Sequence, residues 1–175
     1  MQKHKLLANW DFILSVPRWS PDGSRLVVEG PTSDQSDLEL FLISRDGQIE
    51  QLTNLNAYSH IVYLNYSWSP DGQYVAAWVA DKESTVNLAK NEAELVIIDT
   101  RTRLVTDTCI RVKYRGTGYG GRPPTAPFWS PDGKQLVVMD WYEADHRRVI
   151  LVDPARGLAT QIAQDMEPVG WMLAP

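Results

Sequence analysis

Short apolar runs separated by polar turns recur along the chain and predict β-strands. Leu26–Val28, Val75–Val79 and Leu136–Met139 are almost wholly apolar. Runs of about four to eight apolar or alternating residues, bounded by Gly, Pro, Asp and Ser, are typical of strands. No window carries a sustained apolar stripe at the helical period, so we expect almost no helix. The pattern therefore predicts an all-β protein.

Three nearly identical hexapeptides precede these apolar runs. They are Arg18–Gly23, Ser67–Gly72 and Phe128–Gly133, and each contains Trp-Ser-Pro-Asp-Gly. In this turn Pro sets φ at the second position, Asp tolerates the third and Gly supplies a positive φ at the fourth. The tryptophans at positions 19, 68 and 129 are 49 and 61 residues apart. Recurrence at such a period indicates a repeat architecture, so we expect each Trp to pack between repeats and each Asp to cap its own turn.

Every repeat contains the same order of four predicted strands. The first ends at the Trp, the second leaves the Asp-Gly turn, and the third and fourth follow a polar loop and a second turn. The third strands are Leu38–Ile43, Glu94–Asp99 and Arg148–Asp153, and the fourth strands are Gln48–Thr53, Leu104–Ile110 and Leu158–Ala163. Four short antiparallel strands in a unit of this length describe a propeller blade.

With these motifs the chain resembles the TolB-type β-propeller repeat. It is also similar to the repeats in the propeller domains of prolyl oligopeptidase relatives. The resemblance covers about residues 5–175 and rests on the three Trp-Ser-Pro-Asp-Gly copies with their following apolar runs. It implies three four-stranded antiparallel blades, but it implies little about function, because propellers carry many unrelated activities.

The repeats divide the chain into one propeller region. We expect the end of a preceding blade and a lead-in at 1–15, blades at 16–60, 61–115 and 116–165, and a first-strand stub at 166–175. Closed propellers have about four to eight blades, so three do not close a ring alone. The chain is then part of a longer propeller, half of a six-bladed ring closed by dimerisation, or an open arc with covered faces. First-strand and fourth-strand stubs do not normally pair in one blade, which disfavours the dimer.

The connection between the second and third repeats reverses the local charge. Residues 111–125 carry four basic and no acidic side chains, in a chain of formal net charge −5. Arginine with interleaved aromatic residues suits recognition of a carboxylate, a phosphate or an acidic peptide. The resemblance implies that this connection lies on the ligand-binding face, at the mouth of the central channel. A second candidate is the aromatic pair in the loop of the third repeat, a platform for a peptide or sugar. The predicted ligand-binding residues are Arg111, Lys113, Tyr114, Arg115, Tyr119, Arg122, Trp141 and Tyr142. A solvated, glycine-rich insertion is the alternative interpretation of the connection, and packing on a neighbouring loop is the alternative for the pair.

The sequence offers little for catalysis. The single cysteine, Cys109, excludes an internal disulfide and a cysteine-based zinc cluster. The three histidines are scattered, and no G-x-S-x-G elbow is present. Gly116–Gly121 matches G-x-G-x-x-G, but Arg122 and two prolines follow directly and prevent the helix that a dinucleotide site needs. We therefore predict no catalytic residue, no metal and no cofactor.

Charge and hydropathy narrow the choice of partners. A net charge of −5 is unsuited to general nucleic-acid binding, and no segment approaches the roughly 18 apolar residues of a membrane helix. The first 16 residues lack the uninterrupted apolar core of a signal peptide. That slightly favours the cytoplasm, whereas the resemblance implies the periplasm or the cell exterior.

We predict a non-catalytic binding or scaffold module for a protein or peptide, with a homodimer as one form of partner. One alternative is a propeller hydrolase or lyase with a metal at the channel mouth. The other is a purely structural piece of a longer propeller.

Overall fold

The computed structural model describes residues 16–32, 38–57, 61–81, 92–114, 124–141 and 146–171. They form three four-stranded antiparallel sheets, each built from four consecutive strands. Sheet 1 contains β1 (Arg18–Trp19), β2 (Arg25–Pro31), β3 (Leu38–Ser44) and β4 (Ile49–Gln51). Sheet 2 contains β5 (Ile61–Trp68), β6 (Tyr74–Asp81), β7 (Glu92–Asp99) and β8 (Val105–Lys113). Sheet 3 contains β9 (Phe128–Trp129), β10 (Leu136–Trp141), β11 (Arg147–Asp153) and β12 (Leu158–Gln164).

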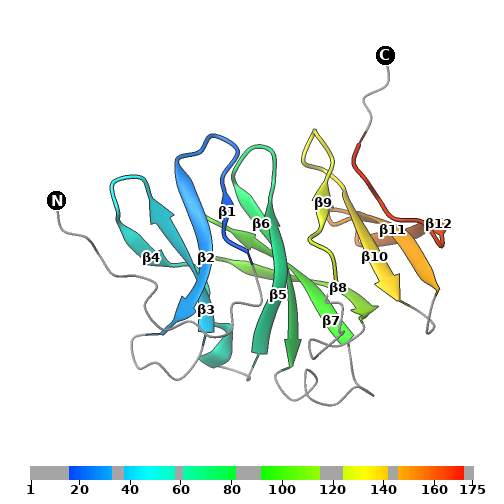
Figure 1. Ribbon diagram of the computed structural model, residues 1–175, viewed down its shortest axis with the longest axis horizontal. Helices are drawn as coiled ribbons and strands as arrows, with labels where there is room; N and C mark the ends of the chain where they lie inside the picture. Colours follow the sequence, from blue (N-terminus) through cyan, green and yellow to red (C-terminus); the bar gives the residue numbers. More distant parts are fainter. Residues whose placement is uncertain are drawn as a thin grey trace.

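The three sheets stand side by side in chain order (Figure 1). The β1–β2, β5–β6 and β9–β10 hairpins lie at the same edge, at the top of this view. Sheet 2 occupies the middle, and we call its contact with sheet 1 junction 1 and its contact with sheet 3 junction 2. The only helix in the described part of the chain is a single 3-10 turn, η1 (Leu55–Ala57). The prediction of an all-β protein with three four-stranded antiparallel sheets is confirmed.

The Trp-Ser-Pro-Asp-Gly turns are held by their own side chains. In the first, the Asp22 carboxylate accepts hydrogen bonds from the Ser20 hydroxyl (2.6 Å) and the Ser24 amide (3.0 Å). The Ser20 hydroxyl in turn accepts one from the amide of Arg25 (3.0 Å). Gly23 has φ 66°, which glycine adopts without strain. The other two turns repeat these contacts, so the predicted capping role of the aspartates is confirmed.

The middle sheet is buried on both faces, which explains the apolar run of β6. Side chains alternate between the two faces of a strand. Val75, Ala77 and Val79 belong to the hydrophobic cluster at junction 1. Ala76, Trp78 and Ala80 belong to the cluster at junction 2. A strand covered on both sides needs apolar residues at every position.

The repeat tryptophans join successive sheets. The indole Nε1–H of Trp68 donates to the carbonyl of Arg18 (2.9 Å), and that of Trp129 donates to the carbonyl of Ser67 (3.4 Å). In both cases the acceptor is the residue just before the Trp of the preceding sheet. Trp171 continues the series by donating to the carbonyl of Phe128 (3.4 Å). We call this contact the Trp joint; it confirms that Trp68 and Trp129 pack between sheets.

Candidate binding sites

Two of the predicted basic residues lie at the end of β8. The Arg111 guanidinium forms an ion pair with the Glu94 carboxylate (2.7 Å) across β7 and β8. The pairing of the two strands shifts between Glu94 and Val96, and Cys109 has φ 58° at this irregularity. The bulge brings Asp107 beside Glu94 as well. Burial raises the pKa of Glu94, the hydrogen bond and like charge of Asp107 add to the rise, and Arg111 opposes it.

A buried carboxylate fastens the end of β8 to sheet 3. The backbone amide of Lys113 donates to Asp140 Oδ1 (2.7 Å), and the Arg148 guanidinium contacts the other oxygen. Asp140 and Arg148 are directly opposite in the β10–β11 ladder, and Asp140 is only 2% exposed. We call this arrangement the Asp140 clamp. Sequence reasoning missed it, although an aspartate directly after an apolar strand core was a signal.

Two predicted aromatic ligand-binding residues lie in the protein interior. Tyr114 is 3% exposed within the junction 2 cluster, and burial raises its pKa. No described residue accepts a hydrogen bond from its hydroxyl. Trp141 is 7% exposed, and the Arg147 guanidinium lies over its ring, 5.3 Å from the centroid. Both rings therefore contribute to packing here, and a ligand-binding role stays a prediction.

The remaining predicted residues, Arg115, Tyr119, Arg122 and Tyr142, lie outside the described residues. The returning end of the connection is anchored at junction 2 by three side chains of sheet 2. Asn65 Nδ2 donates to the Pro124 carbonyl (2.7 Å), Trp78 Nε1 to the Thr125 carbonyl (2.8 Å), and the Ser67 hydroxyl to the Pro127 carbonyl (2.5 Å). The connection thus leaves and re-enters the fold at the same junction.

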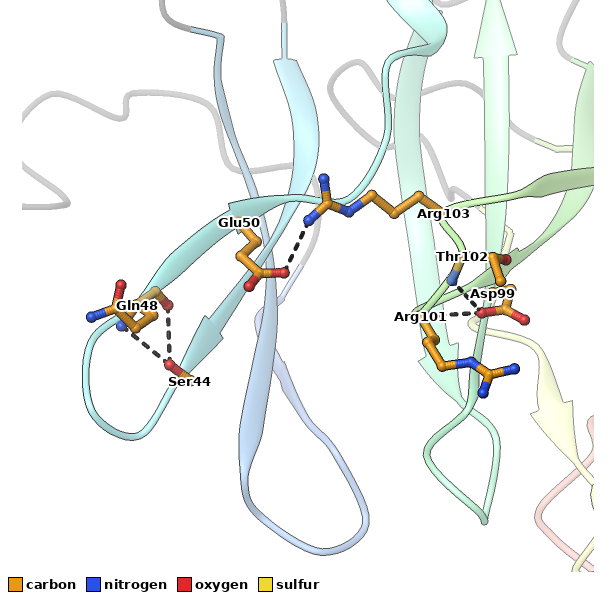
Figure 2. Close-up of polar contacts among 7 residues, drawn as sticks. All are labelled: Ser44, Gln48, Glu50, Asp99, Arg101, Thr102 and Arg103. Atoms are coloured by element: carbon orange, nitrogen blue, oxygen red, sulfur yellow. Dashed lines mark hydrogen bonds and ion pairs between the residues drawn. The ribbon is translucent and has the colours of Figure 1, made fainter.

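Junction 1 is sealed at its surface by charged side chains. Figure 2 shows Arg103, at the β7–β8 turn, reaching Glu50 on β4, with 3.1 Å between Nη2 and Oε2. The turn itself is held by the Asp99 carboxylate, which accepts the amides of Arg101 and Thr102 (2.8 Å each). Deeper in the junction, Arg25 donates to the Gly72 carbonyl (2.9 Å) and lies 5.3 Å from the Trp68 ring centroid. Two arginines thus bridge sheet 1 and sheet 2.

Junction 2 has an open groove of about 770 Å³ in the corresponding place. Strand register aligns the repeats. Thr106 occupies the position of Glu50, and Tyr74 the position of Arg25. Gly157 occupies the turn position of Arg103. None of these three equivalent positions at junction 2 therefore carries an arginine. The lining residues are Tyr74, Ile97, Thr106, Trp129, 132–135 and 153–156.

The groove combines apolar walls with a charged rim. The Asp132 carboxylate accepts the Ser130 hydroxyl (2.6 Å) and the Lys134 amide (3.1 Å), which hold its pKa below the usual range. The Asp153 carboxylate accepts the Arg156 amide (3.1 Å). Lys134 and Arg156 form ion pairs with these carboxylates at 3.9 and 3.7 Å, too long for hydrogen bonds, and their side chains are 80% and 76% exposed. The rim therefore carries two exposed ion pairs whose acids also hold the turns.

Metal-binding groups do not gather in the described part of the chain. Across these residues, no three His, Cys, Asp or Glu side chains lie close enough together to hold a metal ion. The same residues contain no helix with the length and apolar character needed to cross a membrane.

Successive antiparallel four-stranded sheets, packed face to face by a repeated contact, are the architecture of propeller blades. The described chain is a three-blade portion of a β-propeller. It is similar in structure to a putative TolB from Agrobacterium tumefaciens (21% identity, TM-score 0.53), covering 83% of this chain and 47% of that one. It is also similar to a prolyl endopeptidase (18%, TM-score 0.56; 83% and 21% covered) and to the propeller domain of the Trilobed protease from Pyrococcus furiosus (14%, TM-score 0.51; 88% and 42% covered).

These likenesses confirm the predicted TolB-like propeller fold. The chain spans less than half the length of each of these structures. No protein-family model matches the sequence, and no curated protein matches it. Since proteins with this fold include enzymes and non-enzymes, function has to be argued from the surface of this chain.

Proposed function

We propose that the chain is a non-catalytic protein-binding module, and that the outer face of sheet 1 takes up a second copy of the same chain. One observation carries this proposal. In each sheet the repeat Trp starts a row of directly opposite side chains that crosses all four strands. In sheet 2 the whole row, and in sheet 3 its first three members, pack against the preceding sheet, whereas in sheet 1 the row faces outward.

The three rows can be compared position by position. In sheet 2 the row is Trp68, Val75, Ile98 and Val105, all within the junction 1 cluster. In sheet 3 Leu136 and Val152 belong to the junction 2 cluster and Trp129 packs against it, while the fourth residue, Ala159, is exposed. In sheet 1 the row is Trp19, Leu26, Ile43 and Ile49. Here the two ends of the row, Trp19 and Ile49, are 57% and 45% exposed, and Leu26 and Ile43 between them are half-buried, although the row has the same apolar character.

The opposite end of the chain offers a complementary surface. Asp165 donates its amide to the Arg147 carbonyl (2.8 Å), and Trp171 makes its joint with Phe128. The segment between them thus runs along sheet 3 and leads into a further Trp joint. Gly170 lies just before Trp171, so its carbonyl has the position of the acceptor carbonyl in a Trp joint. Met166 and Val169 in the same segment are strongly exposed.

In the proposed assembly, Trp19 of one copy donates to the Gly170 carbonyl of the other. This contact extends the series of Trp joints without requiring the two end segments to pair as strands of one blade. The exposed apolar residues of both ends, including Val16 and Val169, become buried together. Such a head-to-tail contact joins two different patches, so it closes into a ring or continues as a chain.

Light scattering after size exclusion tests this proposal, over a protein concentration range from micromolar to submillimolar. We expect a species at twice the 19.8 kDa chain mass or a larger multiple, and Trp19→Ser should shift it to the monomer. Leu104→Ser is the matched control, because Leu104 is equally exposed but lies in the β7–β8 turn of the middle sheet. A monomer at all concentrations, or an assembly that Trp19→Ser leaves intact, contradicts the proposal.

A mixing experiment tests the head-to-tail geometry. Val169→Asp should abolish self-association, as Trp19→Ser does. Mixing the two variants restores one intact contact, Trp19 from one protein against an unaltered 165–171 segment from the other. We therefore expect a heterodimer from two proteins that are each monomeric alone. A mixture that stays monomeric contradicts a contact between two different patches.

A further inference from the structure

We propose that the groove at junction 2 binds an acidic peptide segment, with an apolar side chain of the peptide between the sheets and its carboxylates on Lys134 and Arg156. This inference goes beyond the proposed self-association, because the groove lies between sheets 2 and 3 and does not include the Trp19 row. Each proposal can therefore fail while the other stands.

The groove exists because three side chains differ between the junctions. At junction 1, Arg25 fills the space beside Trp68, and the Glu50–Arg103 pair bridges the rim. At junction 2, tyrosine, threonine and glycine occupy these three positions. The backbone frame and the Trp joint are common to both junctions, so the opening results from side-chain choice.

The walls suit an apolar anchor. Tyr74, Ile97 and Trp129 line the space, and all three are only partly buried. Trp129 already uses its Nε1–H in the joint with Ser67, so what remains for a ligand is its ring. Apolar walls with a few placed polar groups are the usual character of a binding pocket, and a volume of about 770 Å³ is within the ordinary range.

The rim suits carboxylates. Asp132 and Asp153 each accept turn hydrogen bonds on one oxygen, and the second oxygen forms an ion pair with Lys134 (3.9 Å) or Arg156 (3.7 Å) that is too long for a hydrogen bond. These exposed ion pairs leave the N–H donors of Lys134 and Arg156 unused by the two aspartates, so a carboxylate of a partner can accept hydrogen bonds from them. A charge-assisted hydrogen bond to Arg or Lys is about twice as strong as a neutral one. The matching ligand therefore has an apolar anchor residue between two residues that carry carboxylates.

Three tripeptides distinguish the contribution of the apolar anchor to binding from the contribution of the carboxylates. They are acetyl-Asp-Phe-Asp-amide, acetyl-Asn-Phe-Asn-amide and acetyl-Asp-Ala-Asp-amide, titrated into the ¹⁵N-labelled protein and followed by NMR. We expect saturable shifts at the Trp129 indole N–H and the Gly133 amide with the first peptide. The second and third should bind about tenfold more weakly, since each lacks one of the two contacts. Equal binding of the Asn peptide overturns the acidic specificity, and shifts outside the groove overturn the site.

A variant that introduces the junction 1 ion pair at junction 2 gives the structural control. Thr106→Glu with Gly157→Arg recreates the Glu50–Arg103 pair across junction 2. The turn tolerates arginine, because Arg103 has the same φ of 62° as Gly157. This double variant should close the groove and abolish the shifts, while Lys134→Gln with Arg156→Gln should weaken only the Asp peptides. The matched control is Arg101→Gln, which removes a cation from the β7–β8 turn and should leave binding unchanged. Undiminished binding by the closed variant overturns the proposal.

Discussion

Junctions 1 and 2 share one backbone plan but differ in how their interiors and rims are completed. Both have a Trp joint and both stack one Asp-Gly turn on the next: a Cβ at Gly72 or Gly133 would lie 3.7 Å from the proline of the preceding turn. These shared contacts come from the repeat motif. The differences arise at positions outside the motif, so the motif specifies assembly while the variable positions specify surface chemistry.

The difference extends to the other end of the two junctions. Asp140 and Arg148 of sheet 3 face sheet 2, and the corresponding residues of sheet 2 are Val79 and Glu94. Junction 1 has an ion pair at its rim and, inside, an apolar cluster beside the buried Glu29, which lies opposite Leu40. Junction 2 has an ion pair inside, the Asp140 clamp, and an open rim. The Asp140 clamp joins sheets 2 and 3, and Val79 stands at the position of Asp140 in sheet 2, so we expect this polar contact to stabilise junction 2 with no counterpart at the same level of junction 1.

The largest expected effect comes from truncating the tryptophans. Trp68→Ala should destabilise the protein by about 3–5 kcal/mol, because it leaves a large cavity in a packed cluster. Trp129→Ala should cost about half as much, since its ring borders the open groove and its hydrogen bond is longer. Urea unfolding followed by circular dichroism measures both.

Phenylalanine variants separate the ring from the hydrogen bond and guard against a chain that fails to fold. Trp68→Phe retains most of the ring packing. Loss of the hydrogen bond to the Arg18 carbonyl should lower the free energy of unfolding by about 1 kcal/mol, in addition to the effect of the smaller ring. If the Trp68 and Trp129 variants lose equal free energy of unfolding, the two junctions are equally well packed and the difference inferred between them is wrong.

The next effect tests the clamp. Asp140→Asn should destabilise the protein by about 2 kcal/mol, below the usual cost of breaking a buried pair, because the Arg148 side chain retains access to solvent. The matched variant at the same level of junction 1 is Glu94→Gln. It should be close to neutral, since burial and Asp107 already disfavour the charged carboxylate. If Glu94→Gln proves the more damaging, the assignment of polar stabilisation to junction 2 is wrong.

Features that belong to the repeat motif were predictable from the sequence, whereas features outside the motif were not. The turns, the strand order and the inter-sheet tryptophans were predictable, because a contact such as Ser20 to Asp22 is local and recurs with the motif. The groove was not, because Thr106 and Gly157 become neighbours of one space only through the register of two sheets. The fourth strand of the second repeat also extends beyond its predicted end at Ile110 to Lys113, across the irregularity at Cys109.

The predicted aromatic residues show a second limit. Tyr114 and Trp141 border segments that have the composition of loops, which suggested exposed rings. Trp141 is instead the last residue of β10, and Tyr114 directly follows β8. At a strand end, the direction of one side chain decides between solvent and core, and composition carries no information about that direction.

A smaller effect is expected from the rim of junction 1. A double-mutant cycle with Glu50→Thr and Arg103→Gly should give a coupling of about 0.5 kcal/mol, because both side chains are more than half exposed. Raising the salt concentration should reduce the coupling further. A coupling of several kcal/mol would mean that the bridge is structural rather than a surface contact.

The smallest effect concerns the turns at low pH. Hydrogen bonds from Ser20 and Ser24 lower the pKa of Asp22 from 3.8 to about 2. A folded pKa below the unfolded value means that the ionised form favours folding. Its stabilising contribution is complete above about pH 4 and is lost as the pH falls toward 2.

Asp22→Asn should therefore unfold with a weaker dependence on pH between about 4 and 2 than the parent protein, as measured by urea midpoints across that range. The turn at junction 2 provides the comparison. Asp132 accepts the Ser130 hydroxyl and the Lys134 amide, but lysine replaces the second serine. Asp132→Asn should flatten the pH dependence less than Asp22→Asn does. Ser24→Ala should bring the first turn to the level of the third, because it removes the one hydroxyl donor that distinguishes them. If Ser24→Ala leaves the acid dependence unchanged, the two turns differ for another reason than this side chain.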